Sequence, residues 1–239
     1  IEWCKFSDIE WTKDSTGFYY ARYAKPESLG SGDAQSAAGT ETDAAENQMI
    51  YFHKVGTPVA QDQLVYKTPE HPKWMFGSSV SDDGRFLLVT TNDSCDPVNR
   101  LYMRDLRSEA AGGDAPMIKA VDNLDAMWSY VTNDGDDFVF MTNRDAPRCM
   151  VVRVTGLGGA RDEAAAQACF SKSSVQTLVP ESTSDVLESV QVVCEGVLVA
   201  KYLRDCKNVI VLLRLSDGKV ITEVEMPFIG SVLAITGRR

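Results

Sequence analysis

The sequence is poor in residues that hold metals and cofactors. Its 239 residues include only two histidines, and none of its six cysteines forms a C-x-x-C pair. A structural zinc site needs closely spaced Cys and His ligands, so we expect no metal and no cofactor. Scattered cysteines in a chain of this length without a secretory signal are typical of reduced thiols, so we expect a cytoplasmic protein.

Long apolar runs and an excess of positive charge are also missing. No apolar run of about 18 residues occurs, which argues against a membrane span. The net charge is −10, which disfavours a nucleic-acid partner. Residues 1–5 read IEWCK, which is not a signal peptide and contains no initiator methionine. We therefore expect the sequence to start within a longer protein or after trimming.

Motifs for nucleotide, calcium or peptide-bond chemistry are absent. There is no P-loop, Rossmann glycine pattern, EF-hand loop or H-E-x-x-H. The G-x-S-x-G pentad that presents the nucleophile of α/β-hydrolases is missing too, because residues 77–81 lack the second glycine. His53 falls in a predicted strand and His71 in a linker, so neither is placed to serve as a catalytic base. We expect no catalytic residue in this chain.

Acidic side chains cluster at predicted turns. Asp82 and Asp83 precede one glycine, and residues 134–137 contain three further aspartates around another. Aspartate at such positions ordinarily caps backbone N–H groups. These carboxylates are therefore predicted to stabilise turns and not to bind calcium.

What the sequence does contain is a β unit, clearest over residues 74–106. Ser81–Gly84 is a turn whose glycine accepts the positive φ of a tight hairpin. The apolar run Phe86–Val89 has the composition of a buried strand. A polar loop over residues 92–99 then leads to another strand at Leu101–Met103. Together these parts form one antiparallel meander.

The same order of parts occurs four times. Its glycines are Gly17, Gly84, Gly135 and Gly196, and two further apolar runs follow each of them. Four short strands per repeat, at a period of about 50 residues, are typical of β-propeller blades. A β-sandwich with frequent turns is the alternative, but it does not explain a repeated order of parts. The predicted fold is all-β, with about four four-stranded blades and the start of a fifth.

We expect one partial propeller domain over residues 1–239. Its blades are predicted at about 7–67, 74–121, 124–180 and 186–226, with the first strand of the next blade at 228–239. A propeller closes by pairing its last blade with its first, which protects the sheet edges. Four blades leave two open ends, so the chain is predicted to be an internal piece of a longer protein.

Three polar stretches interrupt these blades. Residues 28–47 form a predicted surface loop, either a gating or contact loop or a tolerated insertion. Residues 109–116 form a predicted outer hairpin turn. Residues 156–168 have room for one or two helical turns but no apolar stripe to dock them. A fourth break, Ser216–Lys219, is a predicted Asp-Gly hairpin turn.

Short motifs spread over almost the whole chain add a family resemblance. They are Lys73-Trp74-Met75, Ser81-Asp82-Asp83-Gly84-Arg85, Cys95-Asp96-Pro97-Val98-Asn99-Arg100-Leu101, Thr142-Asn143-Arg144, Val179-Pro180-Glu181, Asp185-Val186-Leu187-Glu188 and Gly230-Ser231-Val232. In this order they resemble the seven-bladed propeller domain of prolyl oligopeptidases, a family of serine peptidases. The resemblance implies a parent enzyme that cuts short peptides after proline. It places the Ser-Asp-His triad on an α/β-hydrolase domain that is absent from this sequence.

The resemblance also implies substrate-binding positions. In the family, the Met of K-W-M and the Cys before D-P-V-N-R line part of the pocket for the residue third from the scissile bond; here they are Met75 and Cys95. Both side chains suit an apolar pocket, although Met75 as blade core is the alternative. Many members carry Arg three residues before this Cys, whereas this chain has Asn92. A cation that could reach the substrate is therefore lost.

Two functional hypotheses follow. In the first, the chain is the non-catalytic propeller of a prolyl oligopeptidase, which gates access and has short proline-containing peptides and the hydrolase domain as partners. In the second, it is a protein-interaction propeller of the WD40 or kelch type, although the signatures of those repeats are missing. In both, the isolated chain is predicted to lack peptidase activity. Its open sheet edges predict oligomers or aggregates in solution.

Overall fold

The computed structural model describes residues 1–24, 45–107, 116–194, 196–227 and 229–237. In this part of the chain the strands form four four-stranded antiparallel sheets. The first contains β1 (Ile9–Trp11), β2 (Gly17–Arg22), β3 (Met49–Lys54) and β4 (Gln63–Tyr66). The second contains β5 (Met75–Val80), β6 (Phe86–Asn92), β7 (Arg100–Asp105) and β8 (Ile118–Val121).

The third and fourth sheets repeat this plan. The third contains β9 (Trp128–Asp134), β10 (Asp137–Thr142), β11 (Met150–Val154) and β12 (Val175–Val179). The fourth contains β13 (Val186–Val193), β14 (Val197–Arg204), β15 (Lys207–Arg214) and β16 (Val220–Glu223). In each sheet the strands lie side by side in chain order.

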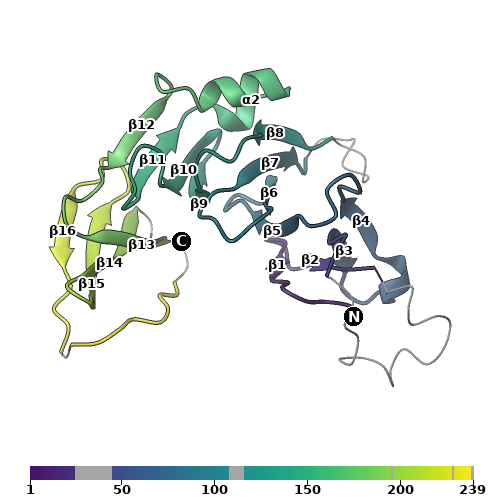
Figure 1. The fold of residues 1–239 in the computed structure, drawn as a ribbon, viewed down its shortest axis with the longest axis horizontal. Helices are drawn as coiled ribbons and strands as arrows, with labels where there is room; N and C mark the ends of the chain where they lie inside the picture. The colour runs from purple at the N-terminus through teal and green to yellow at the C-terminus, as the bar shows by residue number, and fades with distance from the viewer. Residues whose placement is uncertain (25–44, 108–115, 195, 228, 238–239) are drawn as a thin grey trace.

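The sheets stand next to one another along an arc (Figure 1). The first strand of each sheet lies on the concave side of the arc and the fourth strand on the convex side. Four-stranded meanders arranged around an axis are the blades of a β-propeller. The predicted fold class is therefore confirmed, and the β-sandwich alternative is wrong.

The apolar run Phe86–Val89 in β6 explains how the sheets stack. All four residues are buried, because a strand presents alternate side chains to opposite faces and both faces are covered. Phe86 and Leu88 pack into the core shared with the third sheet. Leu87 and Val89 pack into the core shared with the first sheet. A central sheet of the arc thus needs a continuous apolar run and not an alternating one.

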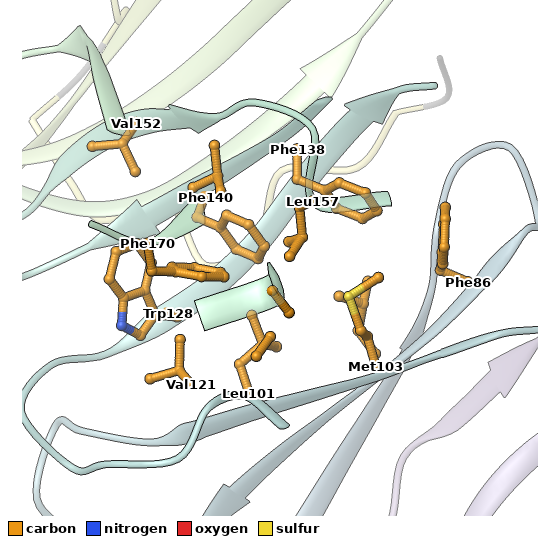
Figure 2. Packing of buried hydrophobic residues seen from close by; sticks show 14 of the residues in the cluster. Phe86, Leu101, Met103, Val121, Trp128, Phe138, Phe140, Val152, Leu157 and Phe170 are labelled. Carbon is orange, nitrogen blue, oxygen red and sulfur yellow. The ribbon is translucent and has the colours of Figure 1, made fainter. Parts of the chain in front are cut away.

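The core between the second and third sheets is rich in aromatic side chains (Figure 2). Phe86 and Phe138 meet edge to face, with ring centroids 5.4 Å apart. Trp128 contacts Phe170 in the same way, with centroids 4.8 Å apart. Burying each such ring stabilises the fold by roughly 1.5–3 kcal/mol. This contact between sheets therefore contributes strongly to the rigidity of the arc.

Three of the four repeat glycines take the left-handed conformation in the turn between the first and second strands of their sheet. Gly84, Gly135 and Gly196 have φ values of 71°, 56° and 88°. In the first sheet Ser15 takes the left-handed conformation, with a φ of 58°, whereas Gly17 already belongs to β2. A Cβ on Gly17 would lie 2.4 Å from the Phe52 ring. Gly17 is thus required because a side chain would clash with Phe52, and not because the turn is left-handed there. The prediction that Gly17 occupies the same turn position as the other repeat glycines is wrong.

Asp83 hydrogen-bonds within its own turn, as the sequence predicts. Its Oδ1 accepts from the Ser81 hydroxyl at 2.6 Å and from the backbone N–H of Arg85 at 3.0 Å. Asp137 differs, because its Oδ1 accepts the N–H of Gly156, far along the chain after β11, at 2.8 Å. Within the described residues no group of three or more His, Cys, Asp or Glu side chains is arranged to hold a metal ion.

Residues 156–168 contain most of a short helix, as the sequence allows, but this helix is docked, which was not predicted. Helix α2 (Glu163–Cys169) starts at Asp162, whose Oδ1 accepts the N–H of Ala165 at 2.8 Å. Ala166 is fully buried where α2 contacts β8, and Phe170 follows directly into the aromatic core. The prediction that nothing could dock this segment is wrong, because one small side chain and one ring after the helix are sufficient.

Residues 229–237 form no strand, although the sequence predicts one there. The segment nevertheless docks on the fourth sheet. The N–H of Val232 donates to Asn208 Oδ1 at 2.6 Å, and the N–H of Asn208 donates to the carbonyl of Gly230 at 3.2 Å. A strand forms only where a neighbouring strand supplies backbone hydrogen bonds. Among the described residues, no strand pairs with residues 229–237.

The same kind of contact joins the first sheet to the second and the second to the third, whereas the N–H of Leu187 in the fourth sheet donates to the backbone carbonyl of Arg148 at 2.9 Å. Gln48 Oε1 accepts the N–H of Phe76 at 2.6 Å, and Asn99 Oδ1 accepts the N–H of Trp128 at 2.7 Å. In both cases an amide side chain at the start of the third strand accepts from the first strand of the next sheet. Val232 makes with β15 the contact that the first strand of the next sheet makes at these two junctions.

Two predicted loops fall mainly on residues that are not described. These are 28–47, of which only 45–47 are described, and 109–116, of which only 116 is described. Within the described ranges no helix combines the length and the apolar character needed to cross a bilayer.

Candidate substrate-binding loop

Met75 and Asn92 lie opposite each other at one end of the second sheet. Met75 is the first residue of β5 and Asn92 the last of β6, and the strand register pairs them. The neighbouring Phe76 is buried, but Met75 is 37% exposed. The alternative that Met75 is blade core is therefore wrong, and its side chain is available to a partner.

Cys95 lies in the loop that follows Asn92. Its thiol is exposed and free. Ser94 Oγ donates to Asp96 Oδ2 and accepts from the Asp96 N–H, both at 3.1 Å. The N–H of Val98 donates to the carbonyl of Asp96 at 2.8 Å. These local bonds hold residues 93–99 in a tight turn at the same end of the sheet as Met75.

Side-chain amides anchor this loop. Asn92 Nδ2 donates to the carbonyl of Val98 at 3.0 Å and so closes the base of the loop. Asn143, directly after β10 of the third sheet, donates from Nδ2 to the carbonyl of Pro97 at 2.8 Å. Its Oδ1 accepts the N–H of Met127 at 2.7 Å. The loop is thus fixed both to its own sheet and to the next one.

A cation stacked on an aromatic ring lies nearby. The Arg100 guanidinium is 4.3 Å from the centroid of the Trp74 ring, and the His71 ring stacks on Trp74 at 3.8 Å. Arg100 also forms ion pairs with Asp93 and Asp122, both at 3.6 Å. Two carboxylates therefore hold the Arg100 guanidinium in place on the Trp74 ring.

Two tyrosines beside this group remain protonated. The Tyr102 hydroxyl donates to Asp122 Oδ1 at 2.5 Å. Burial, reinforced by this hydrogen bond, raises the pKa of Tyr102 far above its usual range. Burial raises the pKa of Tyr66 to about 12. Both are neutral hydroxyl groups near pH 7, and neither can serve as a base there.

His53 belongs to a separate group on the first sheet. Its Nδ1 lies 2.7 Å from Asp62 Oδ1, and the Tyr20 hydroxyl donates to Asp62 Oδ2 at 2.6 Å. The Asp62 side chain is fully buried, so these two bonds satisfy it. His53 therefore has a structural partner, as His71 does in its stack on Trp74.

Part of this arrangement was predicted from the sequence. Met75, Asn92 and Cys95 lie together at one end of the second sheet, but Asn92 is the last residue of β6 and not the first of the loop, and its pairing with Met75 was not predicted. The anchoring role of Asn143 and the stacking of Arg100 on Trp74 were not predicted either. These three residues occur in the family motifs T-N-R, N-R and K-W-M, which were the available signal.

This fold and this loop define a propeller domain of the prolyl oligopeptidase type. A family model described as prolyl oligopeptidase, N-terminal beta-propeller domain, matches residues 1–239, and the chain belongs to that family. The match favours this family over the WD40 or kelch alternative.

Individual relatives agree with the family assignment. The prolyl endopeptidase of Dictyostelium discoideum is 32% identical over 97% of this chain, which covers 30% of that protein. The dual function macrocyclase-peptidase of Amanita bisporigera is 29% identical over 100% of this chain and 29% of its own length. A structure of prolyl oligopeptidase B from Galerina marginata, bound to a 25mer macrocyclization substrate, gives a TM-score of 0.79 at 29% identity, covering 96% of this chain and 29% of that one. The chain thus spans about 30% of the length of these relatives.

Proposed function

We propose that this chain is the non-catalytic propeller part of a serine-type endopeptidase that cuts short peptides after proline. The observation that carries the proposal is the match of the family propeller model to all 239 residues. The Ser-Asp-His triad belongs to an α/β-hydrolase domain of the same cytoplasmic parent protein. Residues 1–239 are one partial domain of a seven-bladed propeller, with blades at about 7–67, 74–121, 124–180 and 186–226 and the next one starting at 228–239.

In this function the propeller limits access to the catalytic domain and contributes to the substrate pocket. Met75 and Cys95 supply adaptable apolar surface for the residue third from the scissile bond. Exposure of both side chains at one end of the second sheet supports this role. Asn92 replaces a cation of the family and offers the substrate only an uncharged amide.

The test uses the parent protein and the isolated chain with a fluorogenic Gly-Pro peptide. The parent is expected to turn the peptide over, whereas the isolated chain is expected to give none. Turnover by the isolated chain that survives repurification and scales with its concentration would overturn the assignment of catalysis to another domain.

A bulky maleimide tests the pocket. Bulk added to the Cys95 thiol narrows the pocket, so KM is expected to rise more than kcat falls. Cys95→Ser should make the parent resistant, whereas Cys194→Ser, which removes an exposed thiol in the β13–β14 turn, should not. Inhibition of Cys95→Ser as fast as that of the parent would show that Cys95 does not line the pocket.

A further inference from the structure

The hydrogen bonds around Cys95 assign a role to a residue on a different sheet. We infer that Asn143 is a positioning residue for substrate, because it holds the Cys95 loop in place from the third sheet. This inference rests on the proposed function, in which that loop lines the substrate pocket. The side chain of Asn143 itself need not touch the substrate.

The amide nitrogen and the amide oxygen of Asn143 each hydrogen-bond to a different segment of the chain. Its Nδ2 donates to the carbonyl of Pro97 in the loop, and its Oδ1 accepts the N–H of Met127 in the connection between β8 and β9. An amide has donors on one side and an acceptor on the other, so only one orientation satisfies both bonds. The N–H of Met127 therefore fixes the direction in which Asn143 points its donor.

Polar contacts hold the outer part of the loop in place. Residues 93–97 are all exposed, so no buried side chain holds them. Asn92 ties the base of the loop to the second sheet through the Val98 carbonyl. Asn143 and Asn99 tie its second half to the third sheet, the latter through Ala126 and Trp128. The loop therefore bridges the second and third sheets, and its position depends on both sheets.

A binding surface that is fixed before the ligand arrives loses less free energy on binding. Without the Asn143 anchor the loop must be ordered when substrate binds, so KM rises. The triad lies on another domain and is untouched, so kcat changes little. Loss of one such hydrogen bond corresponds to a KM increase of about 5-fold.

Two variants of the parent protein separate this role from general damage. Asn143→Asp keeps the acceptor for Met127 but places an oxygen against the Pro97 carbonyl. Asn143→Ser removes the anchor without adding charge, in case the first variant does not fold. Asn123→Asp is the matched control, since it adds the same charge on the exposed β8–β9 connection, where Asn123 accepts only a long 3.4 Å bond from Asp125.

Two measurements are made on each protein: steady-state kinetics with the Gly-Pro peptide, and hydrogen–deuterium exchange of the peptide covering residues 93–99. Both Asn143 variants should exchange faster in this loop, with KM raised about 5-fold and kcat within about 2-fold of the parent. Asn123→Asp should match the parent both in exchange of residues 93–99 and in KM and kcat. Unchanged exchange, or faster exchange with unchanged KM, overturns the inference. A failure of the proposed function is recognised separately, because then even a bulky group on Cys95 of the unaltered parent leaves KM unchanged.

Discussion

Arg85 in the second sheet donates from Nη1 to Asp136 Oδ1 in the third sheet at 2.7 Å. The same guanidinium donates from Nε to Asp105 at 3.0 Å and from Nη2 to the carbonyl of Gly158 at 3.1 Å. It also lies 4.5 Å from the centroid of the Phe86 ring. One side chain thus joins the two sheets at the end opposite to the Cys95 loop.

Arg85→Lys should lower the free energy of unfolding by about 1–2 kcal/mol, because lysine cannot make three fork-shaped hydrogen bonds at once. The Arg85 side chain is 18% exposed and Asp105 is 23% exposed, so solvent screens their bond less than the bond to Asp136, which is 48% exposed. Thermal or denaturant unfolding followed by circular dichroism measures the effect. Arg161→Lys is the control, since Arg161 is 73% exposed and only approaches Asp105 at 4.0 Å. Equal losses in both variants would contradict a specific role for Arg85.

A second prediction concerns the docking of α2. Ala166→Glu should destabilise the fold by about 3 kcal/mol or more, because a carboxylate would be forced into the buried contact with β8. Ala164→Glu adds the same side chain to the exposed face of the same helix and should change stability by less than about 0.5 kcal/mol. The unfolding midpoint of Ala166→Glu is compared with that of Ala164→Glu to test whether α2 is docked. Similar midpoints would mean that α2 is not held against the sheet.

A third prediction tests the contact that docks residues 229–237. Asn208→Ala removes the acceptor for the Val232 N–H. Amide exchange should rise in residues 230–237 and stay unchanged in the paired residues 189–193 of β13, because these pair directly with β14 and lie beyond Glu188, the residue of β13 to which the Asn208 side chain donates. Thr222→Ala, which alters an exposed side chain of the same sheet, is the control. No rise in exchange after Asn208→Ala would show that this amide does not hold the segment.

The strands were predictable from sequence because their signal is local. Phe86–Val89 and Phe138–Met141 are apolar without interruption, and this is the composition that a strand needs when sheets cover both of its faces. The role of Asp83 was predictable for the same reason, since it accepts hydrogen bonds from residues only two positions away on either side.

The features that were missed depend on residues far apart in sequence. Asn143 contacts Pro97, and Gln48 contacts Phe76, only because two sheets stand side by side. An asparagine or glutamine in a polar stretch carries no local mark of such a partner. The sequence likewise does not indicate that Ala166 is buried, because the burial of a single alanine depends on the sheet against which the helix packs.

The last prediction concerns Asn92 and rests on the proposed function, in which the parent protein is a peptidase. Asn92→Arg places a cation beside the exposed Met75, at the position where many members of the family carry an arginine that could reach the substrate. An arginine can form charge-assisted hydrogen bonds with a peptide carbonyl or carboxylate, so KM for the Gly-Pro peptide should fall by roughly 3- to 10-fold, with kcat little changed. The gain should shrink at high salt, because exposed charges are screened. Asn92→Gln is the control for side-chain length without charge. An equal fall in KM for Asn92→Gln would exclude charge as the cause. A rise in KM for Asn92→Arg would mean that the lost hydrogen bond from Asn92 to the Val98 carbonyl matters more to the pocket than the added cation does.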